Sequence, residues 1–402
     1  AVHVYTANHA HCWQAGGFRT LRADRRDHSG GKGLTDLEAR VSAVCESVER
    51  FSSVFRGPEP VRLGRRSELE SDSVHPNDLL HFSQDQFRNR DRWNAKAGEG
   101  FQWVPKPYAD EPMEWSPARS LLSGAIRLVP SAAVYLGFTG EGRRFCPGDS
   151  NGLASGNCLE EAILQGFLEL AERDSVALWW YNRARRPAVD LDSFPDPRVQ
   201  DTWALYPSLG RELWVLDLTS DLGIPAFAAL SAVRDGKRPD IIFGFGAHLD
   251  ADIALLRSLS ELNQMLPTVQ RSMEERRRQL LPAFPDAIRW WETATLEDHP
   301  YLLPSRDLAP TVRQDMTRPM HEDLLSAVEE CTTRAAAVGC DVLVHELTRP
   351  DVGFPVARVM VPGLRHFWRR LGPGRLYDVP VDLGWVDTPV PESRMNPVSL
   401  FV

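Results

Sequence analysis

The sequence is poor in the residues that build cysteine-ligated metal sites and disulfide frameworks. It has six cysteines in 402 residues. They stand singly and form no CxxC pair, which argues against structural zinc and against a small disulfide-stabilised scaffold. This pattern fits a reducing compartment, and we expect the protein in the cytoplasm. The six are Cys12, Cys45, Cys146, Cys158, Cys331 and Cys340.

Long apolar runs and an excess of positive charge are also missing. The apolar stretch 121–138 is interrupted by Arg127 and Pro130, so it falls short of the ~20 residues that a membrane helix needs. The formal net charge is -9 and the pI is about 5.7, whereas a nucleic-acid-binding domain usually carries a basic face. We therefore expect neither a membrane nor a nucleic acid as partner.

Signals for targeting and for repeats are lacking too. The first residues do not have the charged-then-apolar layout of a signal peptide, and the sequence begins at Ala1 without an initiator methionine. We expect a processed chain or a domain excised from a longer protein. No repeat period is visible. A hydrophobic content of 43% and a charged content of 25% are those of an ordinary folded protein.

Strand and helix signals follow one another without regular alternation. This order favours an α+β fold, with sheets mixed with packed helices, in a single large domain over residues 1–402. Thr35 followed by Glu38 has the spacing of a capping box and predicts a helix start. The proline-punctuated segment 104–118 reads as a loop. The predicted helices are 36–55, 158–180, 250–265 and 321–338, and the predicted strands are 2–5, 125–128, 132–138, 212–218, 226–232, 241–246, 342–347 and 355–360.

Two of the predicted helices carry acidic residues on one face. At ~100° per residue, Ser42, Glu46 and Glu49 lie within about 60° of one another. A second stripe covers about 120° of the next long helix, opposite an apolar face. Clustered carboxylates repel unless a cation lies between them, and magnesium prefers oxygen ligands and is often shared with nucleotide phosphates. The stripes therefore predict a magnesium–ATP site. The second stripe holds Asn157, Glu161, Gln165, Glu169 and Glu172, followed by Arg173.

A glycine-rich segment, Ser29-Gly-Gly-Lys-Gly33, precedes the first acidic helix. Glycines permit close approach of the backbone to phosphate oxygens, and Lys32 supplies a positive charge. The segment is not a P-loop, because the GxxxxGK[ST] spacing is absent. A flexible turn without a ligand is the alternative, but the place of the segment before a magnesium-type helix favours nucleotide contact.

Together these motifs resemble the signature of the YcaO-domain family. The resemblance rests on Gly31-Lys-Gly33, on Ser42 to Arg50 and on Ser150 to Asp174. It implies a YcaO-type ATP-binding fold, unlike the common nucleotide-binding folds, in which glutamates hold magnesium ions around the triphosphate. We expect magnesium ligation by Glu46, Glu49, Glu161 and Glu172, and nucleotide contacts from Lys32, Ser42, Asn157, Glu169, Arg173 and Arg257.

Later segments carry weaker likenesses. Arg257, Glu261 and Gln264 fall on one face of a predicted helix that resembles a family segment bordering the active site. An amphipathic surface helix is the alternative for this face. Arg349 and Arg358 are further candidates for phosphate contact.

The C-terminal segment resembles the ending of azoline-forming cyclodehydratases, whose proline-rich tail carries its terminal carboxylate to the active site. Residues 375–385 and 395–402 bear the likeness, although Ser399 stands where a proline is expected. We therefore expect the carboxylate of Val402 to act as general base. His28, His248 and His345 stay as further candidates for proton transfer.

The resemblance implies ATP-dependent cyclodehydration of Cys, Ser or Thr residues in a ribosomally made precursor peptide, giving thiazoline or oxazoline by phosphorylation of the amide oxygen. Such enzymes work with an E1-like or leader-peptide-binding partner, fused or separate, and are often homodimers. Three alternatives stay open. They are backbone thioamidation with a sulfur donor and a TfuA-type partner, amidine-forming macrocyclisation, and a non-catalytic scaffold that docks peptide in a synthetase complex.

Overall fold

Antiparallel sheets and the helices packed on them form the computed structural model. The structure describes residues 3–9, 27–33, 35–69, 73–97, 102–234, 240–280, 285–316 and 320–401. Within these residues the strands are β1 (His3–His9), β2 (Asp27–Gly33), β3 (Arg62–Gly64), β4 (Met113–Ser120), β5 (Ile126–Pro130), β6 (Leu153–Ser155), β7 (Arg211–Asp217), β8 (Ala226–Val233), β9 (Ile242–Ala247), β10 (Leu343–Glu346) and β11 (Val356–Met360).

The helices of the same residues lie around these sheets. They are α1 (Asp36–Ser52), α2 (Pro76–Leu80), α3 (Gln84–Arg88), α4 (Arg90–Ala97), α5 (Ser131–Val134), α6 (Leu159–Asn182), α7 (Pro197–Ser208), α8 (Ala251–Val269), α9 (Met273–Leu280), α10 (Pro285–Thr293), α11 (Leu324–Ala337) and α12 (Arg375–Asp382). The α+β fold class expected from the sequence is confirmed.

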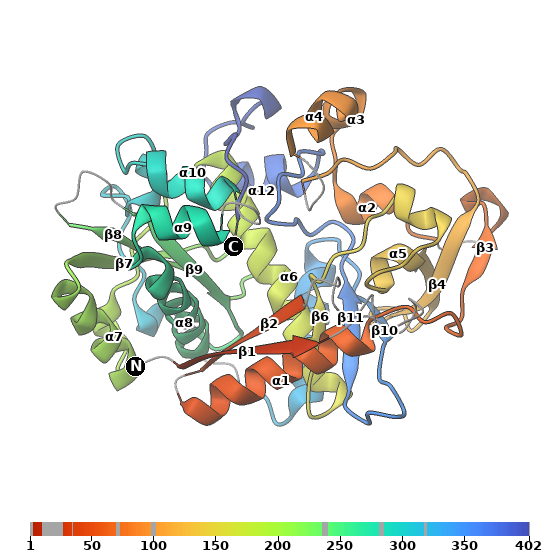
Figure 1. Cartoon of the computed structure of the whole chain (residues 1–402), viewed down its shortest axis with the longest axis horizontal. Helices are drawn as coiled ribbons and strands as arrows, with labels where there is room; N and C mark the ends of the chain where they lie inside the picture. The colour runs from red at the N-terminus through yellow and green to blue at the C-terminus, as the bar shows by residue number, and fades with distance from the viewer. Residues whose placement is uncertain are drawn as a thin grey trace.

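Helix α6 separates two sheets. The larger sheet has the strand order β3-β4-β10-β11-β6 with β5 paired to β4, and the smaller has the order β7-β8-β9. α6 contacts strands of both, and Figure 1 shows it running between them, with α1 and the β1–β2 hairpin crossing beside it. Within the described part of the chain, no helix is long and apolar enough to cross a membrane.

The two acidic helices form as the sequence predicts. In α1, Thr35 is the N-cap: the Glu38 N–H donates to its hydroxyl at 3.2 Å, and its own N–H donates to the Glu38 carboxylate at 3.0 Å. The C-terminal half of α6 is buried on all sides, with Trp179 and Trp180 fully enclosed. Its N-terminal half keeps one polar face. The buried C-terminal half of α6 therefore fixes the position of the acidic face on the N-terminal half.

The segment at 29–33 is part of strand β2, so the alternative of a flexible turn is wrong. β2 pairs antiparallel with β1, with Tyr5 opposite Gly31. The glycines let α1 lie directly on this hairpin. A Cβ at Gly31 would lie 2.1 Å from the Ala39 carbonyl oxygen, and one at Gly33 would lie 2.5 Å from the Ala39 nitrogen. The glycines therefore serve helix–strand packing as well as any ligand.

Two further predictions fail, and one helix was not predicted. Residues 113–120 form strand β4, although 104–118 reads as a proline-punctuated loop; β4 pairs with β3, β5 and β10, and Met113 and Trp115 are fully buried. Residues 131–134 form helix α5, where a strand is predicted. Helix α7 is unforeseen, although Asp196 caps it and a proline occupies its first turn. For β4, pairing with neighbouring strands outweighs the prolines. For α7, the cap was a local signal that the sequence analysis missed.

The contact between β2 and α1 predicts a large effect of one methyl group. We expect Gly31→Ala to lower the free energy of unfolding by about 1–3 kcal/mol, because the added Cβ meets the backbone of α1. Gly30→Ala is the matched control, since its Cβ would meet only the side-chain amide of Gln264, at 3.3 Å. Urea denaturation measures both variants. Equal stability of the two would contradict the packing role of Gly31.

Candidate active site

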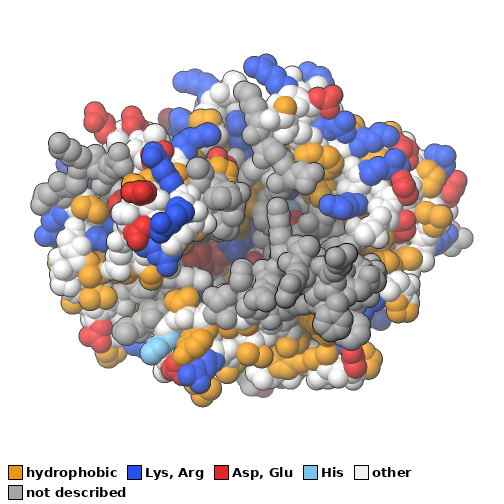
Figure 2. Space-filling model, in the orientation of Figure 1, with side chains coloured by type: hydrophobic (Ala, Val, Ile, Leu, Met, Phe, Trp, Pro, Cys, Tyr) orange, Lys and Arg blue, Asp and Glu red, His pale blue; other side chains and the backbone are white. Residues whose placement is uncertain are grey.

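A cavity of about 750 Å³ lies between α1, β2, α6, α8 and the C-terminal tail. The face seen in Figure 2 is hollowed near its centre, and acidic side chains lie at the bottom of the hollow. Eight of the residues predicted for the nucleotide and metal site line the cavity. They are Lys32, Ser42, Glu46, Glu49, Glu169, Glu172, Arg173 and Arg257.

The other predicted residues do not line it. Asn157 and Glu161 bond to each other at the start of α6: the backbone and side-chain N–H groups of Asn157 donate to one carboxylate oxygen of Glu161 at 2.7 and 2.8 Å. Burial, and then the charge of Glu161, raise the pKa of Cys45, which lines the cavity. Val402, the predicted general base, lies outside the described residues.

On the α1 side of the cavity, the acidic stripe meets the glycine-rich strand. The Gly30 N–H donates to Glu46 at 2.9 Å. Arg50, one turn further along α1, lies 3.3 Å from Glu46 and 3.8 Å from Glu49. The segment before α1, which the sequence predicts to contact the nucleotide, also contacts a glutamate through a backbone N–H of β2.

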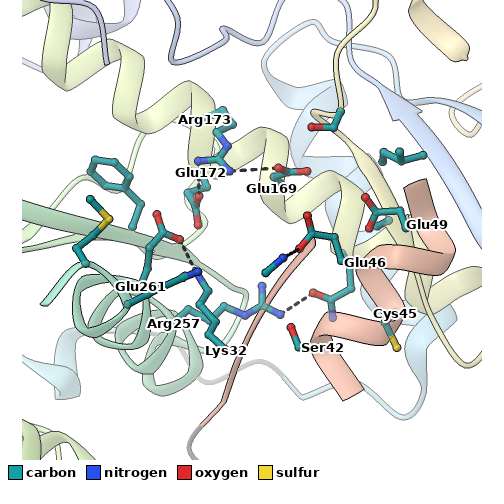
Figure 3. A pocket seen from close by; sticks show the side chains of 18 of the residues that line it. Lys32, Ser42, Cys45, Glu46, Glu49, Glu169, Glu172, Arg173, Arg257 and Glu261 are labelled. Carbon is teal, nitrogen blue, oxygen red and sulfur yellow. Dashed lines mark hydrogen bonds and ion pairs between the residues drawn. The ribbon is translucent and has the colours of Figure 1, made fainter. Parts of the chain in front are cut away.

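On the α6 side, Arg173 holds two carboxylates. It lies 3.2 Å from Glu169 and 3.3 Å from Glu172, and Figure 3 shows these side chains converging. The Gly152 N–H donates to the second oxygen of Glu169 at 3.0 Å. The guanidinium of Arg173 also stacks over the Phe367 ring, 4.3 Å from its centroid. These contacts fix the arginine and both glutamates.

Helix α8 closes the third side. Lys32 of β2 and Glu261 of α8 form an ion pair at 2.5 Å (Figure 3). Arg257 donates to the side chain of Gln165, also at 2.5 Å, and so ties α8 to α6. Since Arg257, Glu261 and Gln264 all line the cavity, the alternative of a surface face for this helix is wrong.

Two charged residues that line the cavity, Glu261 and Arg50, are missing from the predicted set. Glu261 is the partner of Lys32, and its spacing of four from Arg257 was a usable signal. Arg50 neutralises the α1 stripe, yet its position beside Glu49 looks like ordinary helix surface in the sequence. The pairing of Lys32 with Glu261 joins residues 229 apart, which no local pattern shows.

Other candidate residues point elsewhere. Arg358 is buried and pairs with Asp149 at 3.3 Å, and Arg349 pairs with Asp351 at 3.2 Å. His345 bonds to the carbonyl of Pro117 at 2.6 Å. None of these arginines and histidines is among the residues that line the cavity.

The carboxylates carry the electrostatic cost of burial. Burial raises the pKa of Glu49 well above its ordinary value; Arg50 opposes the rise, and Glu169 and Glu46 add to it. Burial also raises the pKa of Glu172 to about 7, against the opposing effect of Arg173. Two carboxyl groups of the cavity thus hold a proton more tightly than free glutamate does. A cation beside them would favour their ionised forms.

The donor set fits a hard divalent cation. Glu46, Glu49, Glu169, Glu172 and Glu261 all line the cavity and offer oxygen ligands of the kind that magnesium prefers. In the described chain, no three Asp, Glu, His or Cys side chains are arranged to hold a metal. Glutamates of the cavity form ion pairs with lysine and arginine instead. Side-chain rotation would free them, and phosphate groups could then take the place of the glutamates beside the basic residues.

The C-terminal tail is anchored on the buried end of α6. Asn396 is fully buried: its N–H donates to the Tyr181 carbonyl at 2.9 Å, and its amide donates to the Tyr301 hydroxyl at 2.8 Å. The Trp180 indole donates to the Val398 carbonyl at 2.8 Å. Phe401 then lines the cavity. The tail is therefore a fixed wall of the site up to the last described residue.

The protein has an α+β fold with an acidic cavity between helices. Arginine side chains pair with the glutamates of this cavity, and the C-terminal tail closes it. Such a site is suited to a metal–nucleotide complex. A family model described as YcaO cyclodehydratase, ATP- and Mg²⁺-binding, matches residues 30–365. Because this match covers most of the chain, the protein belongs to the YcaO family. The resemblance found in the sequence is confirmed.

Solved structures agree. A heterocyclase in complex with substrate and cofactor is 44% identical, with a TM-score of 0.91, and covers 100% of this chain and 53% of its own. The heterocyclase TruD is 43% identical, with a TM-score of 0.82, over 90% of this chain and 50% of its own. The chain thus spans about half the length of these two. YcaO from Methanopyrus kandleri, bound with AMPPCP and Mg²⁺, is 23% identical with a TM-score of 0.63 over 91% of this chain and 83% of its own, and shares the fold.

Two relatives described as uncharacterised proteins also match. A protein of Methanothermobacter thermautotrophicus is 29% identical over 341 residues, which are 84% of this chain and 81% of that protein. A protein in the tfuA 3' region of Rhizobium leguminosarum bv. trifolii is 30% identical over 243 residues, covering 58% of this chain and 53% of its own.

The raised pKa of Glu172 predicts pH-dependent stability in the absence of ligands. The folded state binds this proton more tightly than the unfolded state, so stability falls as the pH rises from the ordinary glutamate value of about 4.3 to about 7. We expect Glu172→Gln to raise the melting temperature at pH 8 by roughly 2–4 °C, and by less at pH 5.

Calorimetry at the two pH values measures this effect. Glu160→Gln, on the same helix but outside the cavity lining, is the control and should show no such trend. A gain for Glu172→Gln that is equal at both pH values would contradict the role of the buried charge.

Proposed function

We propose that the protein is an ATP-dependent cyclodehydratase that converts Cys, Ser or Thr residues of a ribosomally made peptide to thiazoline or oxazoline. The observation that carries the proposal is the single cavity into which α1, α6 and α8 direct five glutamates. Membership of a family described as ATP- and Mg²⁺-binding supports it. The two similar heterocyclases, one with substrate and cofactor bound, support it further.

The reaction makes a ring by moving the amide oxygen onto phosphate. The thiol or hydroxyl of the substrate attacks the preceding carbonyl carbon and loses its proton to a base. The carbonyl oxygen accepts the γ-phosphoryl group of ATP, and ADP leaves. Departure of phosphate, with loss of the amide proton, then forms the C=N bond of the azoline. Phosphorylation is needed because an amide oxygen is otherwise a very poor leaving group.

The protein supplies position and charge for this step. Glu46, Glu49 and Glu172 would hold magnesium, which would neutralise charge on the transferring phosphoryl group. Glu161, which accepts a hydrogen bond from Asn157, would be the fourth magnesium ligand. The remaining polar residues would contact the nucleotide, and these are Lys32, Ser42, Asn157, Glu169, Arg173 and Arg257.

The tail is the proposed source of the base. Asn396 and Trp180 hold the segment that leads to Phe401 at the cavity. The next residue, Val402, would present its carboxylate to the reacting peptide bond. A carboxylate held in a partly dry cavity can accept the proton of the attacking thiol or hydroxyl.

The proposal includes partners. One YcaO cyclodehydratase domain over residues 1–402 would act with an E1-like or leader-peptide-binding module, fused or separate, as a homodimer. The lengths of the two heterocyclases, about twice that of this chain, are consistent with a further module in such proteins.

Backbone thioamidation is the second candidate. It is favoured by one observation, the likeness to a protein in a tfuA 3' region. The same cavity would then direct phosphorylation of the amide oxygen. Sulfide, in place of the substrate side chain, would attack the carbonyl carbon, and the oxygen would leave as phosphate. The higher identity to the two heterocyclases, at 44% and 43%, favours ring formation.

The mass of the peptide product separates these functions. With the protein, its partner, ATP and magnesium, we expect the precursor peptide to lose one water per modified residue. We expect Glu49→Gln to lower the rate by roughly 100-fold or more, while Glu160→Gln leaves it unchanged. Exchange of oxygen for sulfur would identify thioamidation. If ATP binds and the peptide stays unmodified, the result would favour the alternative of a non-catalytic docking scaffold.

Removal of Val402 tests the base. We expect the shortened chain to bind AMPPCP and magnesium as the intact chain does, and to cyclise the peptide roughly 100-fold more slowly. Intact-mass kinetics and calorimetric nucleotide binding measure the two effects. An unchanged rate in the shortened chain would assign the base elsewhere.

A further inference from the structure

The cavity has an apolar wall beside its charged one. Six side chains form this apolar wall: Phe245, Met265, Leu280, Ala287, Trp291 and Phe401. They come from β9, from the end of α8, from α9 and α10 and from the tail. The proposed reaction assigns no role to five of them. Figure 1 shows α9 and α10 beside the point where the chain ends.

We propose that the apolar wall binds an apolar side chain of the peptide substrate, next to the residue that is cyclised. This inference rests on the proposed function and names the substrate class that it prefers. A wall of this kind gains free energy by removing apolar surface from water, and charged side chains lose hydration there without gaining a partner.

The tail places the peptide at this wall. The ring centroid of Phe401 lies 6.1 Å from that of Trp291 and 5.4 Å from that of Phe243. The tail thus enters the cavity as part of the apolar wall. Since the proposed base follows Phe401 directly, the reacting peptide bond must lie within reach of the same wall. A neighbouring substrate side chain would then meet it.

A nucleotide base fits this wall less well. A purine needs hydrogen-bond partners for its ring nitrogens and amino group. Among the described side chains of the apolar wall, the indole N–H of Trp291 is the only conventional hydrogen-bond donor or acceptor. It is buried and has no acceptor within the described residues. A single donor can be satisfied by one peptide carbonyl, whereas it leaves most of a purine edge unpaired.

Short peptides test the preference directly. The probes are acetyl-Gly-X-Cys-Gly-amides with Leu, Asn or Glu at X, titrated calorimetrically into the full chain with AMPPCP and magnesium. We expect the Leu peptide to bind at least tenfold more tightly than the Glu peptide, which corresponds to burial of one apolar side chain. Leu280→Lys should invert this order. Leu303→Lys, at a half-exposed site outside the cavity, should leave it unchanged.

Met265→Ala is the second variant, in case Leu280→Lys does not fold; it should weaken the Leu peptide severalfold without changing AMPPCP affinity. Equal affinities for the three peptides, or no binding of any, would overturn the inference. So would a loss of AMPPCP affinity in Leu280→Lys with the peptide order kept, which would assign the wall to the base. A precursor that is dehydrated without any such preference would leave the proposed function standing. A preference for the Leu peptide without dehydration of the precursor would support the apolar wall as a peptide site and contradict the proposed function.

Discussion

Buried negative charge is the constraint on which this structure depends. Five glutamates face one cavity, and four basic residues face them, from elements that are far apart in the sequence. Burying carboxylates is costly unless each has a partner, so helices α1, α6 and α8 must be held in register for the pairs to form. The raised pKa of Glu49 shows that the pairs compensate only in part. The remaining deficit of positive charge is what makes the cavity receptive to a cation.

Glycine holds two of these helices close to their strands. Gly31 of β2 leaves no room for a side chain against α1, and Gly244 and Gly246 of β9 do the same for α8. A Cβ at Gly244 would lie 2.1 Å from the Leu262 nitrogen, and one at Gly246 would lie 2.3 Å from the Ala254 carbonyl oxygen. Because the helices lie directly on the strands, Glu46 reaches Gly30 and Glu261 reaches Lys32. The strand glycines and the charged cavity are parts of one arrangement.

The sequence predicts those elements whose signals are local. A capping box starts α1, and the 3.6-residue period of α1, α6 and α8 identifies the faces that carry Glu46, Glu169 and Arg257. It fails where distant segments decide. Strand β4 contains Pro117 yet forms, because three neighbouring strands pair with it. Only part of the acidic stripe predicted on α6 lines the cavity. Its first members, Asn157 and Glu161, turn toward each other at the helix start, where unpaired N–H groups attract a carboxylate.

The two walls of the cavity differ in what they can select. The charged wall is built entirely from this chain and would bind any magnesium–nucleotide complex that fits. The apolar wall, on our proposal, recognises one side chain of the peptide, and burial of one side chain contributes about 1.5–3 kcal/mol. That free energy is less than the roughly 4 kcal/mol that even a millimolar dissociation constant requires, so this contact alone is too weak to choose one peptide in a cell. A module that binds the peptide elsewhere would raise its effective concentration at the cavity. The weakness of the local subsite is thus a physical reason to expect a leader-binding partner.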